Sequence, residues 1–141
     1  MIIYFVYLIA YNLICVSMKS IKILLVDDNA IIRKSLLLLL SKIPHVNVVG
    51  ECVDGVEVIP FIKHHKVDVI FMDISMKFMD GYEATERVKQ YYPGVKVIGF
   101  SSQDYIVTID KMIASGADGF ISKYDAEKPL IIAELDRVMN L

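Results

Sequence analysis

The chain has 141 residues, with 15 Lys and Arg against 17 Asp and Glu, which gives a formal net charge of −2. This length fits one domain and hardly two, and the near-neutral charge argues against a nucleic-acid binder that works through a basic patch. An apolar content of 55% excludes a disordered chain. The two cysteines are too few for a disulfide scaffold, and no Cys/His pattern with zinc spacing is present.

The first 18 residues form an apolar leader that contains no Asp, Glu, Lys or Arg. As a helix this segment would span ~27 Å, just short of a hydrocarbon core of ~30 Å. One interpretation is a membrane anchor, with Lys19 and Lys22 holding the rest of the chain in the cytoplasm. Another is a mis-assigned start, because the sequence from Met18 looks like the ordinary beginning of a soluble protein. A third is an apolar helix docked on the domain, and all three stay open.

From residue 21 onward, short apolar runs alternate with longer stretches of helical period. The runs predict five strands, at 21–26, 47–50, 67–72, 95–100 and 119–122. The longer stretches predict five helices, at 31–42, 55–65, 82–91, 105–115 and 126–139. Such alternation implies parallel pairing through right-handed crossovers. Residues 19–141 are therefore predicted to form one α/β domain with helices on both faces of the sheet.

Acidic residues stand where side chains can cap the free N–H groups of four of these helices. They are Asp54, Asp80, Asp104 and Asp125.

Polar and charged side chains follow four of the predicted strands directly. Asp27 and Asp28 follow the first strand, Asp73 the third, Ser101 the fourth and Lys123 the fifth. The carboxyl ends of parallel strands share one edge of the sheet, and ligands bind there near the switch in winding direction. Each acidic residue alone is readily explained as a helix cap, but their joint placement predicts one shallow pocket.

The chemistry of this pocket suits phosphoryl transfer. Three clustered carboxylates repel one another, and Mg²⁺ relieves that repulsion while leaving positions open for phosphate oxygens. A carboxylate such as Asp73 can act as the nucleophile and form an aspartyl phosphate. The cation, Lys123 and the Ser101 hydroxyl can each take one phosphoryl oxygen.

With these residues placed, the sequence resembles the receiver domain of two-component response regulators, over about residues 19–141. Its residue pattern is most like that of the receivers that precede a helix-turn-helix DNA-binding domain. The matching segments are Ile-Leu-Leu-Val-Asp-Asp-Asn at 23–29, Val-Val-Gly-Glu-Cys-Val-Asp-Gly at 48–55, Val-Asp-Val-Ile-Phe-Met-Asp-Ile at 67–74, Met-Asp-Gly-Tyr-Glu-Ala-Thr at 79–85, Val-Lys-Val-Ile-Gly-Phe-Ser-Ser at 95–102 and Ser-Gly-Ala-Asp-Gly-Phe-Ile-Ser-Lys at 115–123. The resemblance implies a flavodoxin-like, doubly wound sheet of five parallel strands in the order 2-1-3-4-5 with five helices.

The resemblance also implies a role for each site residue. Asp73 matches the phospho-acceptor and Lys123 the lysine that contacts the phosphate. Asp28 matches a direct Mg²⁺ ligand, Asp27 its partner acting through water, and the backbone carbonyl of Ser75 the remaining protein ligand. Ser101 matches the switch hydroxyl and Phe120 the aromatic side chain that turns inward with it. The chain departs from the family at Lys77 and Phe78, where the family usually has Pro and often Gly.

By the same resemblance, the chain accepts a phosphoryl group from a sensor histidine kinase or a phosphotransfer protein and switches its surface for an output protein. It catalyses only its own phosphorylation and dephosphorylation, so it is not expected to be an enzyme. We expect a cytoplasmic location, no direct contact with nucleic acid, membrane contact only through residues 1–18, and dimerisation on phosphorylation as one outcome.

Three other functions are compatible with the fold class or with part of the site. A flavin-binding electron carrier needs a phosphate-cradling loop after the first strand, where Asp27 and Asp28 instead repel phosphate. A haloacid-dehalogenase-like phosphatase expects Asp-x-Asp there, and Asn29 occupies the second position. A receiver-like interaction module that does not depend on phosphorylation stays open, because Lys77 and Phe78 alter the loop after Asp73.

Overall fold

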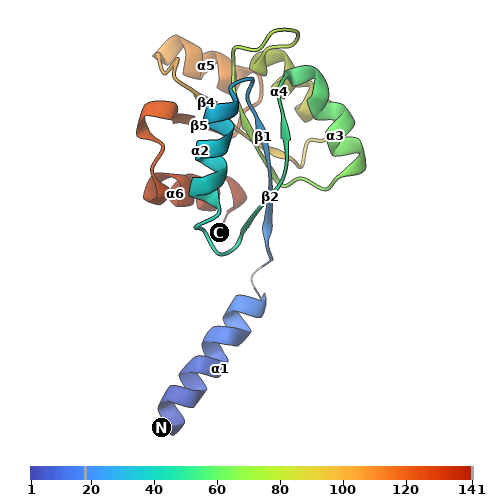
Figure 1. Ribbon diagram of the computed structural model, residues 1–141. Coiled ribbons are helices and arrows are strands. Elements are labelled where there is room, and N and C mark those ends of the chain that lie inside the picture. The colour runs from blue at the N-terminus through green and yellow to red at the C-terminus, as the bar shows by residue number, and fades with distance from the viewer. Residues whose placement is uncertain (18, 141) are drawn as a thin grey trace.

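The computed structural model describes residues 1–17 and 19–140, which form a five-stranded parallel sheet with helices on both faces and one helix outside them (Figure 1). The proposed start at Met18 lies outside the described residues. The strand order is β2-β1-β3-β4-β5. The strands are β1 (Ile21–Val26), β2 (Val46–Cys52), β3 (Val69–Met72), β4 (Lys96–Ser101) and β5 (Gly119–Ser122). The predicted fold class and strand order are confirmed.

The five helices predicted around the sheet are all present. They are α2 (Ala30–Leu40), α3 (Val58–His64), α4 (Gly81–Tyr91), α5 (Ile106–Ala114) and α6 (Lys128–Met139). Two 3₁₀ turns, η1 (Gly55–Glu57) and η2 (Lys123–Asp125), precede α3 and α6. A sixth α-helix, α1 (Ile2–Ser17), lies in the apolar leader, so the helix count exceeds the prediction by one.

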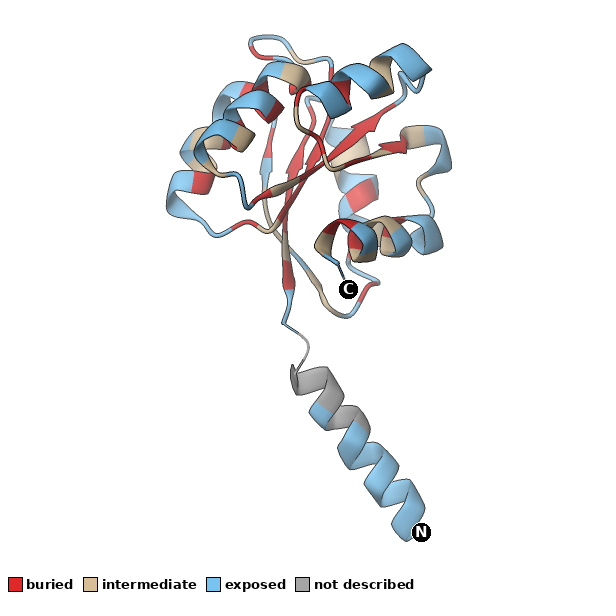
Figure 2. Cartoon of the chain, turned by 180° about the vertical axis from the view of Figure 1, so that it is seen from behind, coloured by how far each residue is buried: buried red, intermediate tan, exposed pale blue. Residues whose placement is uncertain are grey.

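Each face of the sheet has its own hydrophobic core. Side chains of α3, α4 and α5, such as Val58, Val88 and Met112, pack on one face. On the other face, Leu40 of α2 and Leu135 of α6 lie in the second core. All four residues of β3 are buried, as expected for a strand covered on both sides. In Figure 2 the strands are largely buried and the outer faces of the surrounding helices are exposed.

Two of the four predicted caps are correct. Asp80 accepts a hydrogen bond from the Glu83 N–H at the start of α4, and Asp54 accepts one from the Val56 N–H. The prediction for Asp104 was wrong, because α5 begins after Tyr105 and the Asp104 carboxylate accepts a hydrogen bond from Ser122 Oγ instead. The prediction for Asp125 was also wrong, because it ends a 3₁₀ turn and α6 begins after Glu127.

Helix α1 extends away from the end of the sheet at which β1 begins (Figure 1). Its described side chains are exposed, among them Ile2, Ile3, Phe5, Leu8 and Leu13. Across residues 1–17 and 19–140, no helix combines the length and the apolar character needed to cross a membrane. All the buried hydrophobic residues that the structure describes therefore follow α1 in the chain.

Candidate functional site

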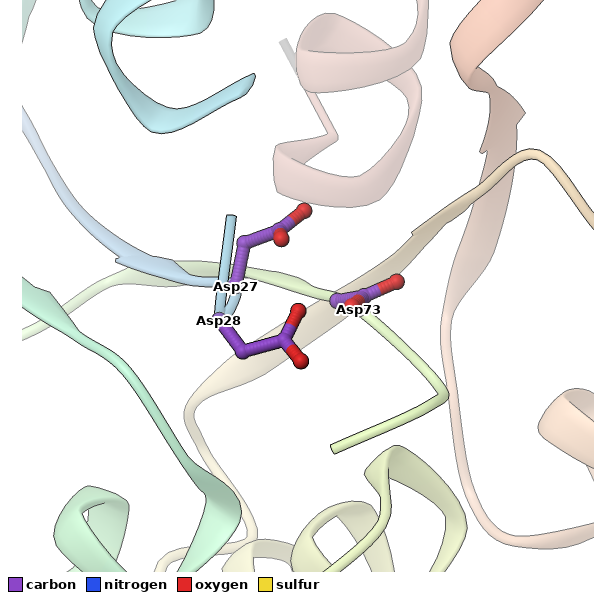
Figure 3. Close-up of side chains that lie close together, drawn as sticks. All are labelled: Asp27, Asp28 and Asp73. Carbon is purple, nitrogen blue, oxygen red and sulfur yellow. The ribbon is translucent and has the colours of Figure 1, made fainter. Parts of the chain in front are cut away.

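Three carboxylates meet at the carboxyl ends of two adjacent interior strands, β1 and β3 (Figure 3). Asp27 and Asp28 follow β1, and Asp73 follows the neighbouring strand β3. The backbone continues the ladder between these strands, because the Asp73 N–H donates a 2.8 Å hydrogen bond to the Val26 carbonyl. One oxygen from each of the three carboxylates lies within 4.8 Å of the others.

The three carboxylates differ in exposure. Asp27 and Asp73 are buried, at 4% and 6% exposure, whereas Asp28 is exposed. Oδ1 of Asp27 accepts a hydrogen bond from the Asn29 N–H, while the buried Oδ2 faces the ammonium group of Lys123 at 2.7 Å without hydrogen-bond geometry. The three carboxylates offer hard, negatively charged oxygen ligands, and Asp28 is open to solvent. Such a set of ligands fits a small divalent cation such as Mg²⁺.

Lys123, at the end of β5, joins the two buried carboxylates. Its Nζ donates a 3.1 Å hydrogen bond to Oδ1 of Asp73 and lies 2.7 Å from Oδ2 of Asp27. Burial lowers the pKa of Lys123, but the contacts with Asp27 and Asp73 outweigh burial, so this pKa lies above its usual value. The lysine is therefore a fixed positive charge in the site.

The pKa of Asp73 lies above the usual value of an aspartate. Burial is the largest cause, and repulsion from the Asp27 carboxylate adds to it. The ion pair and hydrogen bond with Lys123 oppose these effects and do not cancel them. A cation or an added positive charge would favour the ionised form of Asp73, which is the form that acts as a nucleophile.

A pocket surrounds these groups and brings together six of the seven residues singled out from the sequence. Its lining residues are Asp27, Asp28, Asn29, Ile32, Asp73, Ser75, Ser101, Ser102, Gln103, Lys123 and Tyr124. The seventh, Phe120, is half-buried on β5 and packs against the core on the α5 side of the sheet. Its ring lies over Gly99 on β4, where an added methyl group would come within 2.7 Å of Phe120 Cδ2.

The sequence reasoning missed two residues of this site. Gln103 follows β4 and donates hydrogen bonds from its backbone N–H to Ser101 Oγ and from its side chain to Ser75 Oγ, each at 3.1 Å. In the sequence, the position of Gln103 two residues after Ser101 was the feature that could have indicated its place in the site. Asp54 was predicted only to cap a helix, but its carboxylate also accepts hydrogen bonds from Phe78 and Met79 in the loop after Asp73. These residues are 24 and 25 positions further along the chain.

Comparisons with known proteins agree with this geometry. The family model described as the response regulator receiver domain matches residues 23–134. The transcriptional regulatory protein DegU of Brevibacillus brevis is 32% identical over 108 residues, which are 77% of this chain and 46% of that protein. The response regulator VraR of Staphylococcus saprophyticus is 38% identical over 103 residues, which are 73% of this chain and 49% of that protein.

The chain thus spans about half the length of these two relatives. The chemotaxis protein CheY of Halobacterium salinarum is 31% identical over 119 residues, which are 84% of this chain and 97% of that protein. Among solved structures, the signal receiver domain of NarL from Mycobacterium tuberculosis has a TM-score of 0.80 and 29% identity, covering 87% of this chain and 99% of that one.

Proposed function

Because this chain belongs to the response regulator receiver domain family, we propose that it accepts a phosphoryl group on Asp73 and passes the signal on through a change of its surface. The donor is a phosphohistidine on a sensor histidine kinase or a phosphotransfer protein, as the family membership implies. The observation that carries the proposal is the meeting of Asp27, Asp28, Asp73 and Lys123 in one pocket at the strand ends.

The proposed step is a displacement at phosphorus. A carboxylate oxygen of Asp73 forms a bond to the phosphorus of the donor, and the phosphorus–nitrogen bond to the donor histidine breaks. The bonding pair stays on the imidazole nitrogen. The ammonium group of Lys123, 3.1 Å from Asp73 Oδ1, is placed to stabilise the negative charge on the transferred group.

Asp27, Asp28 and Asp73, with the backbone carbonyl of Ser75, are proposed to hold Mg²⁺. When bound, the ion would neutralise part of the carboxylate charge and polarise the phosphoryl group. The close approach of the three carboxylate oxygens, within 4.8 Å of one another, supports this assignment.

A conformational switch is proposed to link phosphorylation to the surface. The Ser101 hydroxyl, which is buried and accepts a 3.1 Å hydrogen bond from the Gln103 N–H, would turn toward the phosphoryl group. The space that it leaves would favour an inward position of Phe120, whose ring now lies over Gly99. The added phosphoryl charge shifts the population between these two packings.

The proposal is tested by incubating the full chain with Mg²⁺ and acetyl phosphate and measuring the intact mass. The expected result is the gain of one phosphoryl group, which disappears with EDTA and in Asp73→Asn. Asp80→Asn is the matched control, because that carboxylate caps α4 outside the pocket and the variant should still gain the group. No mass gain in the wild type, either with acetyl phosphate or with its cognate kinase, would contradict the proposal. It would favour the alternative, an interaction module that does not depend on phosphorylation.

The location of the domain is proposed to be the cytoplasmic side of the membrane, with α1 as a tether. The helix has no charged residue, and its described apolar side chains are exposed, so a lipid surface would remove them from water. Lys19, Lys42, Lys63 and Lys66 are exposed and come shortly before β1, β2 or β3, at the edge of the sheet opposite the pocket. Attachment there to anionic lipids would leave the pocket free.

Flotation with vesicles of phosphatidylcholine and phosphatidylglycerol tests the tether. The full chain should float with the vesicles, and a chain that begins at Met18 should not. Equal behaviour of the two chains would contradict this part of the proposal and leave the phosphoryl acceptor untouched.

A further inference from the structure

A buried carboxylate outside the pocket binds the loop that follows the proposed acceptor. Asp54 lies between β2 and η1 and is 5% exposed. Its Oδ2 accepts a 2.8 Å hydrogen bond from the Phe78 N–H, and its Oδ1 accepts 3.0 Å hydrogen bonds from the N–H groups of Met79 and Val56. Only the Val56 bond is needed to cap the turn that begins there, so the other two serve a different purpose.

The charge state of Asp54 fits this arrangement. Burial raises the pKa of the carboxyl group, but hydrogen bonds from the backbone of Phe78, Val56, Met79 and Lys77 outweigh burial and hold the pKa below its usual value. The group is therefore ionised at neutral pH, and hydrogen bonds to an ionised acceptor are about twice as strong as neutral ones.

The η1 turn, which follows Asp54, is also in close contact with the loop that follows Asp73. A methyl group at Gly55 would lie 2.5 Å from the Met79 carbonyl oxygen, so only glycine lets the η1 turn approach the loop at this point. At the far end of the loop, the Gly81 N–H donates a 2.7 Å hydrogen bond to the Ile74 carbonyl. A methyl group at Gly81 would clash with the Asp73 carbonyl oxygen. Residues 74–80 therefore run from the acceptor to α4 with fixed ends. Between the ends, the Gln103 side chain binds Ser75 near the start of the loop, and Asp54 binds the backbone of Phe78 and Met79.

The hydrogen bonds to Asp54 matter because no proline limits the backbone conformation at positions 77 and 78, in the middle of the loop. Positions 77 and 78 are Lys and Phe, both exposed, whereas a proline at either position would fix φ and remove an N–H group. The Lys77 backbone N–H instead adds to the groups that stabilise the Asp54 carboxylate. In this chain a hydrogen-bonded carboxylate performs the restraint that a proline could supply.

We propose that Asp54 is a positioning residue for the phosphoryl site, which holds residues 74–80 so that the Ser75 carbonyl and the Asp73 carboxylate are fixed for the cation. It touches neither the cation nor the phosphoryl group and acts through the Phe78 and Met79 N–H groups. The inference rests on the proposed function, since it needs Mg²⁺ to bind in the pocket. Metal affinity commonly depends on groups that orient the ligands from outside the coordination sphere.

The variant Asp54→Asn separates this role from the capping role. The amide has one oxygen, which can replace Oδ1 toward Val56 and Met79. Its NH₂ group then faces the Phe78 N–H, so two donors oppose each other and that attachment is lost. Asp80→Ala is the control. It removes the cap of α4 at the end of the same loop, and the hydrogen bond that it removes goes to Glu83 in α4 and not to residues 74–79.

Three measurements on the full chain test the proposal. First, amide hydrogen exchange at Phe78 in EDTA should become faster in Asp54→Asn than in the wild type, because the Phe78 N–H has lost its acceptor. Second, the Mg²⁺ dissociation constant from calorimetry should rise about ten-fold in Asp54→Asn and stay unchanged in Asp80→Ala. Third, the rate of phosphorylation by acetyl phosphate should return to near the wild-type value at saturating Mg²⁺.

The possible failures point to different conclusions. A purely structural role of Asp54 would lower the unfolding temperature of Asp54→Asn and leave the Mg²⁺ dissociation constant of the folded protein unchanged, which would overturn the proposal. If the wild type itself bound no Mg²⁺ and gained no phosphoryl group, the proposed function would fail and this inference with it.

Discussion

The ammonium group of Lys123 donates a hydrogen bond to Oδ1 of Asp73 over 3.1 Å, although β4 separates their strands in the sheet. The same Nζ lies 2.7 Å from Asp27 Oδ2, so one cation holds two buried carboxylates. The lysine side chain is 14% exposed and the carboxylate side chains 5% and 8%. At this depth a charge that loses its partner is costly to keep.

Lys123→Met is therefore expected to destabilise the metal-free protein, because it leaves Asp27 and Asp73 to repel each other. The expected loss is about 3 kcal/mol in EDTA, and Mg²⁺ should restore part of it by supplying a positive charge to the same carboxylates. Phosphorylation by acetyl phosphate should slow about 100-fold, since one stabilising donor is gone. Urea unfolding with EDTA or Mg²⁺, and the time course of the intact mass, check both effects. An equal loss of stability with and without Mg²⁺ would show that the ion does not bind beside Lys123.

A second prediction concerns the pH dependence of stability and follows from the raised pKa of Asp73. Burial and the Asp27 carboxylate raise this pKa, so the folded chain binds the Asp73 proton more tightly than the unfolded chain does. The resulting stabilisation is complete below the unfolded pKa, near 3.9, and is lost as the pH rises through the folded pKa. In EDTA, the stability of Asp73→Asn should therefore fall less than that of the wild type between about pH 4 and pH 7. Urea unfolding across this range measures the difference, and parallel curves for the two proteins would contradict the expectation.

The sequence predicted the sheet well because each strand is a short apolar run ended by a polar residue. The bounds of β1 and β5 match the prediction, and β3 is shorter by two residues, since Asp68 binds the Lys22 N–H beside the strand. The meeting of Asp27, Asp73 and Lys123 was also predictable, because parallel strands bring their carboxyl ends to one edge.

Contacts between loops could not be predicted in the same way. The sequence places Asp54 at the start of a helical turn, but not the Phe78 N–H against its carboxylate. Likewise, Asp104 precedes a helix as a capping residue would. Tyr105 is instead the residue at the start of α5, and the Asp104 carboxylate accepts a hydrogen bond from Ser122. Such contacts depend on how loops from different strands pack, for which local periodicity carries no signal.

Gly99 and Phe120 provide a third prediction, about the proposed switch. A methyl group at position 99 would lie 2.7 Å from Phe120 Cδ2 and 3.3 Å from Met112 Cε, so Gly99→Ala must displace the ring or the strand. We expect a loss of about 1–3 kcal/mol, typical of overpacking, and a changed distribution of Phe120 rotamers. Urea unfolding and the NMR signals of the Phe120 ring measure these effects.

Gly94→Ala is the matched control for this change, because a methyl group there meets no atom within 4 Å. It should leave both the stability and the ring signals near those of the wild type. If Gly99→Ala behaved as Gly94→Ala does, Phe120 would not be held against β4 as described.

The last prediction concerns α1. Its described side chains are exposed, and Ile21 in β1 is the first buried hydrophobic residue among those whose burial the structure describes. Figure 2 shows the described part of α1 in the colour of exposed residues. A chain that begins at Met18 should therefore unfold with a free energy within about 0.5 kcal/mol of that of the full chain, the range typical of changes at exposed positions. Its Mg²⁺ affinity should also be unchanged, because the pocket lies at the opposite edge of the sheet from the start of β1. Urea unfolding and calorimetry of the two chains in detergent-free buffer, each at several protein concentrations, test this. A loss of more than about 2 kcal/mol would be too large for an exposed segment and would mean that α1 folds back onto the domain in solution.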